Sequence, residues 1–289
     1  MADITAPAQR FAAVPSIPMQ APTILVFDSG LGGLSVCREV AKVRPDAYFV
    51  YAADDAAFPY GALSDTVMLA RVREVMTTLI AATRPDLAVI ACNTISTLAL
   101  PALRTDHAIP FVGTVPAIKP ACAASVTKQV SVLATPGTVR RDYTAGLVRE
   151  FAGSCTVTLV PSERLAGYAE TIMRGGEVSD ADLWAEVGPC FVKTPKGRTD
   201  TIVLACTHYP LVVERLRAIA PWPVSFIDPA PAIARRVASL MGPTAFASSP
   251  KPVRVVSTAH PLDAGMIGHI LGRQTRTPEV IAPPLARAS

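Results

Sequence analysis

The chain has 289 residues, of which half are hydrophobic and 17% are charged. That length suits one large or two modest domains, and the composition excludes a largely disordered chain. The formal net charge of +4 is mild. It demands neither nucleic acid nor a membrane as a partner, and it fits an anionic small substrate only weakly.

The N-terminal segment predicts neither a secretory signal nor a membrane anchor. Residues 1–22 are interrupted by prolines and contain no continuous apolar stretch, so we expect a flexible tail there. The longest apolar region, 87–103, contains several polar residues, whereas a membrane span needs about 20 apolar residues. We therefore expect a cytoplasmic protein.

Apolar runs alternate with helical patterns along most of the chain. Strands are predicted at 23–27, 48–52, 87–91, 130–134, 156–160, 201–205 and 253–257, and helices at 34–43, 65–83 and 138–151, with another after Pro229. This alternation predicts an α/β fold with mostly parallel sheets flanked by helices.

A weak internal repeat indicates two similar halves. Residues 86–94 read DLAVIACNT and residues 200–208 read DTIVLACTH. Each segment begins with Asp, continues as an apolar strand, and ends with Ala, Cys and a pair of polar residues. Ligands bind at the carboxyl ends of strands in open α/β sheets. Two such halves facing each other would form a cleft with Cys92 on one side and Cys206 on the other.

The predicted division has two α/β domains with the active site in the cleft between them. The expected boundaries are 1–22 for the N-terminal tail, 22–115 plus 229–275 for the first domain, 116–228 for the second domain and 276–289 for a loose C-terminal tail.

Two of the six cysteines stand apart. No C-x-x-C pair occurs, so no zinc ribbon or thioredoxin-like motif is indicated, and we expect free thiols. Cys92 and Cys206 each end an apolar strand and precede hydrogen-bonding residues, as suits a thiol that must ionise. Spacing alone leaves a structural and a functional interpretation of the pair equally open. Two opposed thiols could remove a proton from one face of a carbon and return one to the other.

Six short motifs occur in order between about residues 23 and 240. They are FDSGLGGLSV at 27–36, Asp54 with PYG at 59–61, ACNT at 91–94, Gly113 with VPA at 115–117, ATPGT at 134–138 and CTHYPL at 206–211. Together they resemble the glutamate racemase family, within the wider aspartate/glutamate racemase superfamily. Each motif alone is weak, whereas the set is specific, and CTHYP is the sharpest member.

The resemblance implies a role for each matched residue. Cys92 and Cys206 would be the catalytic acid/base groups, with Cys92 deprotonating the D-enantiomer and Cys206 the L-enantiomer. The residues implied to line the amino-acid site are Asp28, Ser29, Tyr60, Gly61, Asn93, Thr94, Thr135, Thr138, Thr207 and His208. Glu170 matches a family glutamate near the second cysteine only loosely.

The implied reaction is the interconversion of L-glutamate and D-glutamate without any cofactor, metal or nucleotide. Its product would supply peptidoglycan synthesis. A homodimer is compatible with the resemblance, although the sequence shows no decisive apolar patch for an interface.

Simpler interpretations exist for the supporting residues. Asp28 and Ser29 could form a helix cap, and His208 could be a structural histidine. The glycines of 30–33 do not fit G-x-G-x-x-G, because Ser35 occupies the last position. Cys206-x-His208 has no convincing partner set for a metal.

Three positions depart from the family pattern: Asp55 where threonine is usual, Ile95 where alanine is common and Ala205 where glycine is usual. They bear on substrate preference more than on reaction type. The rival hypotheses are a racemase of aspartate or another small acid, a binding or regulatory protein such as a gyrase inhibitor, and a cysteine hydrolase. A hydrolase would need an oxyanion hole and no second thiol.

Overall fold

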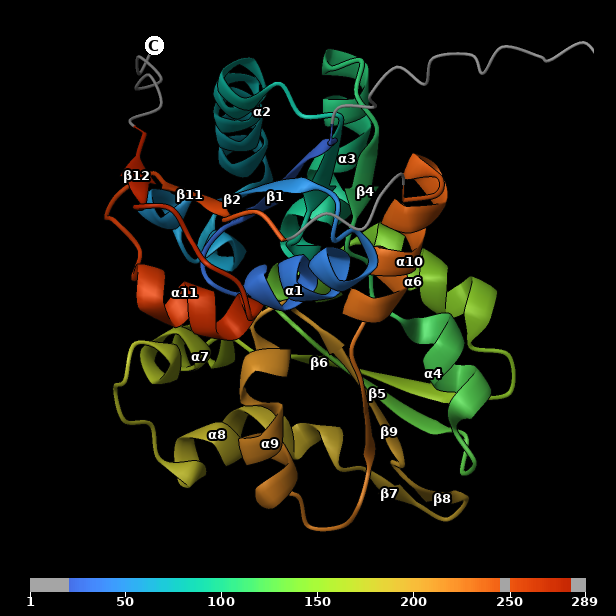
Figure 1. Ribbon diagram of the computed structural model, residues 1–289. Coiled ribbons are helices and arrows are strands. Elements are labelled where there is room, and N and C mark those ends of the chain that lie inside the picture. Colours follow the sequence, from blue (N-terminus) through green and yellow to red (C-terminus); the bar gives the residue numbers. More distant parts are fainter. Residues whose placement is uncertain (1–20, 245–249, 282–289) are drawn as a thin grey trace, which may run out of the picture.

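The computed structural model describes residues 21–244 and 250–281, and it contains two parallel sheets (Figure 1). The first sheet has six strands in the order β12-β11-β2-β1-β3-β4. Their bounds are β1 Thr23–Asp28, β2 Tyr48–Ala53, β3 Leu87–Ile90, β4 Phe111–Gly113, β11 Arg254–Ser257 and β12 Glu279–Val280. All its neighbouring strands pair in parallel.

The second sheet has four strands in the order β10-β9-β5-β6, again all parallel. Its strands are β5 Gln129–Ala134, β6 Thr156–Pro161, β9 Thr201–Ala205 and β10 Ser225–Ile227. A two-stranded antiparallel ribbon, β7 Lys193–Thr194 with β8 Gly197–Arg198, completes this half. In Figure 1 the six-stranded sheet lies in the upper part of the molecule and the four-stranded sheet in the lower part.

Helices cover both faces of the first sheet. One core joins the sheet to α1 (Leu34–Val43), α10 (Ala230–Met241) and α11 (Ala264–Leu271), and the opposite core joins it to α2 (Asp65–Thr83) and α3 (Asn93–Asp106). Ile24 and Val26 of β1 face the first core, whereas Leu25 and Phe27 face the second. A strand buried on both faces explains the unbroken apolar run in the sequence.

The second sheet is covered in the same way. One core includes α7 (Leu165–Met173), α8 (Asp180–Val187) and α9 (Val213–Ala218), and the other includes α4 (Ile118–Ala124) and α6 (Asp142–Phe151). The remaining short helices are α5 Pro136–Val139 and the 3₁₀ turns η1 Asp55–Ala57, η2 Tyr60–Ala62, η3 Gly188–Cys190 and η4 Tyr209–Val212. The predicted α/β fold with parallel sheets flanked by helices is confirmed.

Two predicted elements differ from the structure. The helix expected at 138–151 is divided into α5 and α6, because Arg141 adopts an extended conformation between them (φ −73°, ψ 136°). Residues 279–280, within the loose tail expected at 276–289, form β12, which pairs with β11 at the edge of the first sheet. Residues 1–20 and 282–289 of the two expected tails lie outside the described residues.

Candidate active site between the two sheets

The two halves meet through loops that follow the carboxyl ends of β1, β3, β5 and β9. Ser35 Oγ, at the start of α1, donates to the backbone oxygen of Thr207, beyond β9 (3.1 Å). Across the same junction, Thr94 after β3 contacts Thr135 after β5, with their Oγ1 atoms 2.8 Å apart. The carboxyl ends of the parallel strands therefore bring residues of both halves together at the candidate site.

Cys92 and Cys206 are both buried at this junction. Burial raises the pKa of Cys92 well above the usual value of a thiol, and negative charge on Asp28 and Cys206 raises it further. Hydrogen bonds from the Ile95 backbone and the Ser29 side chain oppose the rise without cancelling it. The surroundings of Cys92 therefore oppose its ionisation.

His208 bridges Cys206 and Glu170. Its Nδ1 lies 3.9 Å from Sγ of Cys206, and its Nε2 lies 3.0 Å from Oε1 of Glu170. Burial lowers the pKa of His208, but the hydrogen bonds to Cys206 and Glu170 outweigh burial and hold that pKa well above its usual value. Both ring nitrogens therefore have a polar neighbour, and the Gly32 N–H also lies 3.2 Å from Nε2.

Glu170 connects this histidine to the first half. Its Oε1 accepts from the Leu31 N–H (2.5 Å), and Nη2 of Arg174 lies 3.2 Å from its Oε2. Burial raises the pKa of Glu170, but the bonds to His208, Leu31 and Arg174 outweigh burial and lower it. The loosely matched glutamate therefore lies against His208, where its hydrogen bond raises the pKa of the imidazole.

The loop at 30–33 needs glycine because side chains from both halves approach its backbone closely. A Cβ at Gly32 would lie 2.7 Å from Oγ1 of Thr207 and would also overlap the His208 ring. A Cβ at Gly33 would lie 2.7 Å from Cβ of Asp28. Gly32 therefore serves close packing of the two halves and Gly33 close packing within the first half, rather than the dinucleotide-binding pattern that the sequence already argued against.

Three threonines and one glycine form a second contact across the junction. Thr94, Thr135 and Thr138 have their hydroxyl oxygens within 2.8 to 3.5 Å of one another. A Cβ at Gly61 would lie 3.4 Å from Cβ of Thr135. The structure thus brings Thr94 and Gly61 of the first half together with Thr135 and Thr138 of the second.

Asp28 and Asn93 carry buried polar atoms that are free for a ligand. Oδ2 of Asp28 accepts from the Gly33 N–H (2.6 Å), whereas within the described residues Oδ1 of Asp28 and both amide atoms of Asn93 have no hydrogen-bond partner. Burial is the main reason that the pKa of Asp28 is raised. Because buried polar groups are normally satisfied, these atoms are suited to a polar ligand.

Tyr60 is placed by residues to which the sequence analysis gave no role. Its hydroxyl donates to Oδ2 of Asp54, which also accepts from Nε of Arg71 (2.9 Å). Burial raises the pKa of Asp54, but the hydrogen bonds from Arg71, Thr258 and Tyr60 outweigh burial and lower it. The tyrosine hydroxyl is therefore engaged within its own half. Asp54 lies in a quoted motif, but nothing in the sequence near it signalled Arg71 or Thr258.

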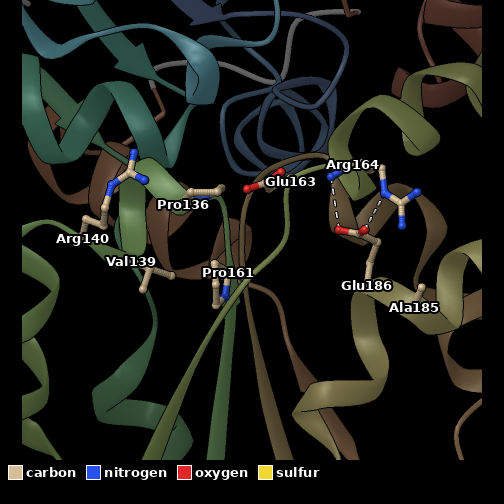
Figure 2. Close-up of a pocket in the computed structure, with 8 residues that line it drawn as sticks. All are labelled: Pro136, Val139, Arg140, Pro161, Glu163, Arg164, Ala185 and Glu186. Carbon is tan, nitrogen blue, oxygen red and sulfur yellow. Dashed lines mark hydrogen bonds and ion pairs between the residues drawn. The ribbon is translucent and has the colours of Figure 1, made fainter.

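Two surface grooves open beside this buried junction. One, of about 380 Å³, is lined by Pro59, Gly61 and Thr135, which places it next to the threonine cluster. The other, of about 510 Å³, shares Arg140 and Arg164 with it. Figure 2 shows Arg140 on one side of this groove and Arg164, paired with Glu186, on the other. Cys92 and Cys206 are buried, with 6% and 7% of their surface exposed.

The described residues, 21–244 and 250–281, include no helix long and apolar enough to cross a membrane. Within the same ranges, no group of three or more His, Cys, Asp or Glu side chains is arranged to hold a metal ion. The chemistry that the junction offers is proton transfer by two thiols beside a charged imidazole–carboxylate pair.

Comparison with known proteins agrees with this chemistry. The model of the Asp/Glu/Hydantoin racemase family matches residues 34–237. The glutamate racemase of Brucella anthropi is 52% identical over 239 residues, which cover 82% of this chain and 86% of that protein. The glutamate racemase of Brucella canis is 53% identical over 237 residues, covering 82% and 85%.

A solved structure shows the same arrangement. It is the Escherichia coli glutamate racemase in complex with L-glutamate and the activator UDP-MurNAc-Ala, which is 39% identical, with a TM-score of 0.80 over 91% of this chain and 98% of that one. Sequence and fold agree, and the chain belongs to the Asp/Glu/Hydantoin racemase family and, within it, to the glutamate racemases.

Proposed function

We propose that this isomerase interconverts L-glutamate and D-glutamate by proton transfer between its two buried cysteines, Cys92 and Cys206. One sulfur, as thiolate, removes the α-proton from one face of the substrate. The other, as thiol, delivers its proton to the opposite face, so the protein ends with the protonation states of the two cysteines exchanged. The configuration of the α-carbon is inverted because the two cysteines act on opposite faces of the substrate.

The observation that carries this proposal is the placement of two buried cysteines at one junction. Cys92 follows β3 in the first half, and Cys206 follows β9 in the second. A two-base racemase needs one proton donor and one acceptor at the same time. By family similarity, Cys92 deprotonates the D-enantiomer and Cys206 the L-enantiomer.

The surrounding polar groups suit an amino acid with two carboxylates. Oδ1 of Asp28 is a buried, unpartnered acceptor for the ammonium group, and the Asn93 amide offers both a donor and an acceptor. Hydroxyls of Thr94, Thr135 and Thr138 can donate to a carboxylate. The substrate is held by neutral donors, with no arginine among these residues.

The site also accounts for the proposed division into two domains. Residues 22–115 with 229–275 form one domain, residues 116–228 form the other, and the substrate lies between them. We place the enzyme in the cytoplasm, where its D-glutamate supplies peptidoglycan synthesis. A homodimer remains a prediction from the family resemblance.

Proton NMR in D₂O tests the proposal. We expect purified protein to remove the α-proton signal of L-glutamate without added cofactor, with D-glutamate appearing on a chiral column. Cys92→Ala and Cys206→Ala should each lower the rate by about 10²–10⁴-fold or more. The half-buried Cys155→Ala is the matched control and should retain activity. Full activity in either active-site variant would contradict the proposal, and exchange only with aspartate would change the substrate.

A further inference from the structure

The loop that carries Tyr60 and Gly61 is held by a segment about 200 residues later in the chain. Oδ1 of Asp55 accepts from the backbone N–H groups of Thr258 (2.9 Å) and Ala259 (2.8 Å), and Oδ2 accepts from that of His260 (3.2 Å). A single carboxylate thus binds three successive amides just beyond β11.

Thr258 adds a second set of bonds to the same loop. Its hydroxyl donates to Oδ1 of Asp54 (2.6 Å) and accepts from the Ala56 N–H (3.1 Å). Asp54 in turn accepts the hydroxyl of Tyr60. The bonds therefore run without a break from the segment after β11, through Asp54, to the residue that precedes Gly61.

Gly61 is the point at which this loop meets the other half of the molecule, through Thr135. The loop also lines the groove beside the site, with Pro59 and Ala62 among the lining residues. Two short 3₁₀ turns, η1 and η2, offer few backbone bonds of their own to fix its path. External contacts must therefore set its position.

We propose that Asp55 and Thr258 are positioning residues for substrate binding, which fix the loop at 54–62 so that Gly61 closes against Thr135. This inference rests on the proposed placement of glutamate between the two halves. Neither residue is proposed to touch the substrate. Both act through the backbone of the loop.

Steady-state kinetics of L-glutamate racemisation test this role. A misplaced loop should weaken binding of the substrate and of the transition state by the same amount. Asp55→Ala and Thr258→Val should therefore each raise KM roughly tenfold and change kcat by less than about threefold. The conservative variants should recover much of the loss. Asp55→Asn keeps Oδ1 as an acceptor, and Thr258→Ser keeps the hydroxyl.

Asp263→Ala is the matched control. Asp263 lies in the same C-terminal region and accepts from the Met266 N–H (2.5 Å) at the start of α11, and within the described residues it has no hydrogen bond to the loop at 54–62. It should lower the melting temperature and leave KM unchanged. An unchanged KM in Asp55→Ala and Thr258→Val, with wild-type activity intact, would overturn the inference, as would KM changes that simply follow the melting temperature. Absence of racemisation in the wild type would instead count against the proposed function.

Discussion

His208 lies fully enclosed between a sulfur and a carboxylate. A histidine in an apolar interior would be neutral, because burial penalises its charged form. Here Glu170 and Cys206 reverse that preference and raise its pKa. Glu170 also accepts from the Leu31 N–H. The carboxylate that pairs with His208 in the second half is therefore also bonded to the backbone of the first half.

This raised pKa predicts how stability depends on pH. The folded state binds the proton of His208 more tightly than the unfolded state, so its stabilisation is complete below the unfolded pKa of about 6.5 and is lost as pH rises through the higher folded value. In urea unfolding above pH 6.5, the wild type should lose stability more steeply than His208→Gln, by up to about 1.4 kcal/mol per pH unit.

Glutamine is chosen at this position because it can still donate to Glu170 while it cannot titrate. A stability difference between wild type and His208→Gln that stays constant from pH 6 to 9, or widens, would show that the histidine is not protonated in the folded protein.

The loop between β1 and α1 shows why an element's sequence can be dictated by a distant one. Gly32 in this loop is required by the ring of His208 and the side chain of Thr207, which lie beyond the end of β9. The loop's local turn would tolerate other residues, since no left-handed conformation is needed at Gly32. Contact between the two halves is what excludes a side chain.

Gly32→Ala should therefore damage catalysis more than stability. The added methyl overlaps the His208 ring and must separate the two halves, and misplacement of this kind costs about 100-fold in rate. Racemisation rate and melting temperature should be measured together.

Gly167→Ala in α7 provides the control for a glycine substitution without a contact. A Cβ there meets nothing within 4 Å, so the change should keep activity and add about 0.5 kcal/mol of stability through helix propensity. Near-normal activity in Gly32→Ala would mean that the two halves need not pack so closely.

At the scale of the whole molecule, two sheets with separate cores share one site. Bonds made by Glu170, Ser35 and Thr94 cross the junction, and both cysteines are buried there. A further ion pair, between Arg141 and Asp65, joins the start of α6 to the start of α2. The candidate site is therefore built from both halves at once.

Ligand binding should consequently stabilise both halves together. L-glutamate at about 100 times its dissociation constant should add about 2.7 kcal/mol to the free energy of unfolding. Hydrogen exchange should slow in β1 and β5 alike, because the ligand lies between the sheets that contain them. Protection confined to one sheet would contradict a site shared by both halves.

The sequence predicted the strands well because each central parallel strand is buried on two faces and leaves an unbroken apolar run, as at 23–27 and 201–205. It did not predict α3, whose residues continue the apolar run of β3 and contain Pro101. Where a buried helix follows a buried strand, both are apolar on all sides, so the spacing of hydrophobic residues does not mark the boundary between them. The edge strand β12 was missed because it is two exposed residues long.

The sequence by itself determined the reaction class, because Cys92 and Cys206 occur in repeated settings within a specific set of motifs. Only the tertiary structure decided the electrostatics. It placed Glu170 against His208, engaged the Tyr60 hydroxyl with Asp54, and brought Thr258 to a loop some 200 residues earlier. Motifs record which groups the chemistry needs, whereas charge coupling and loop position depend on distances that arise only when separate segments pack together.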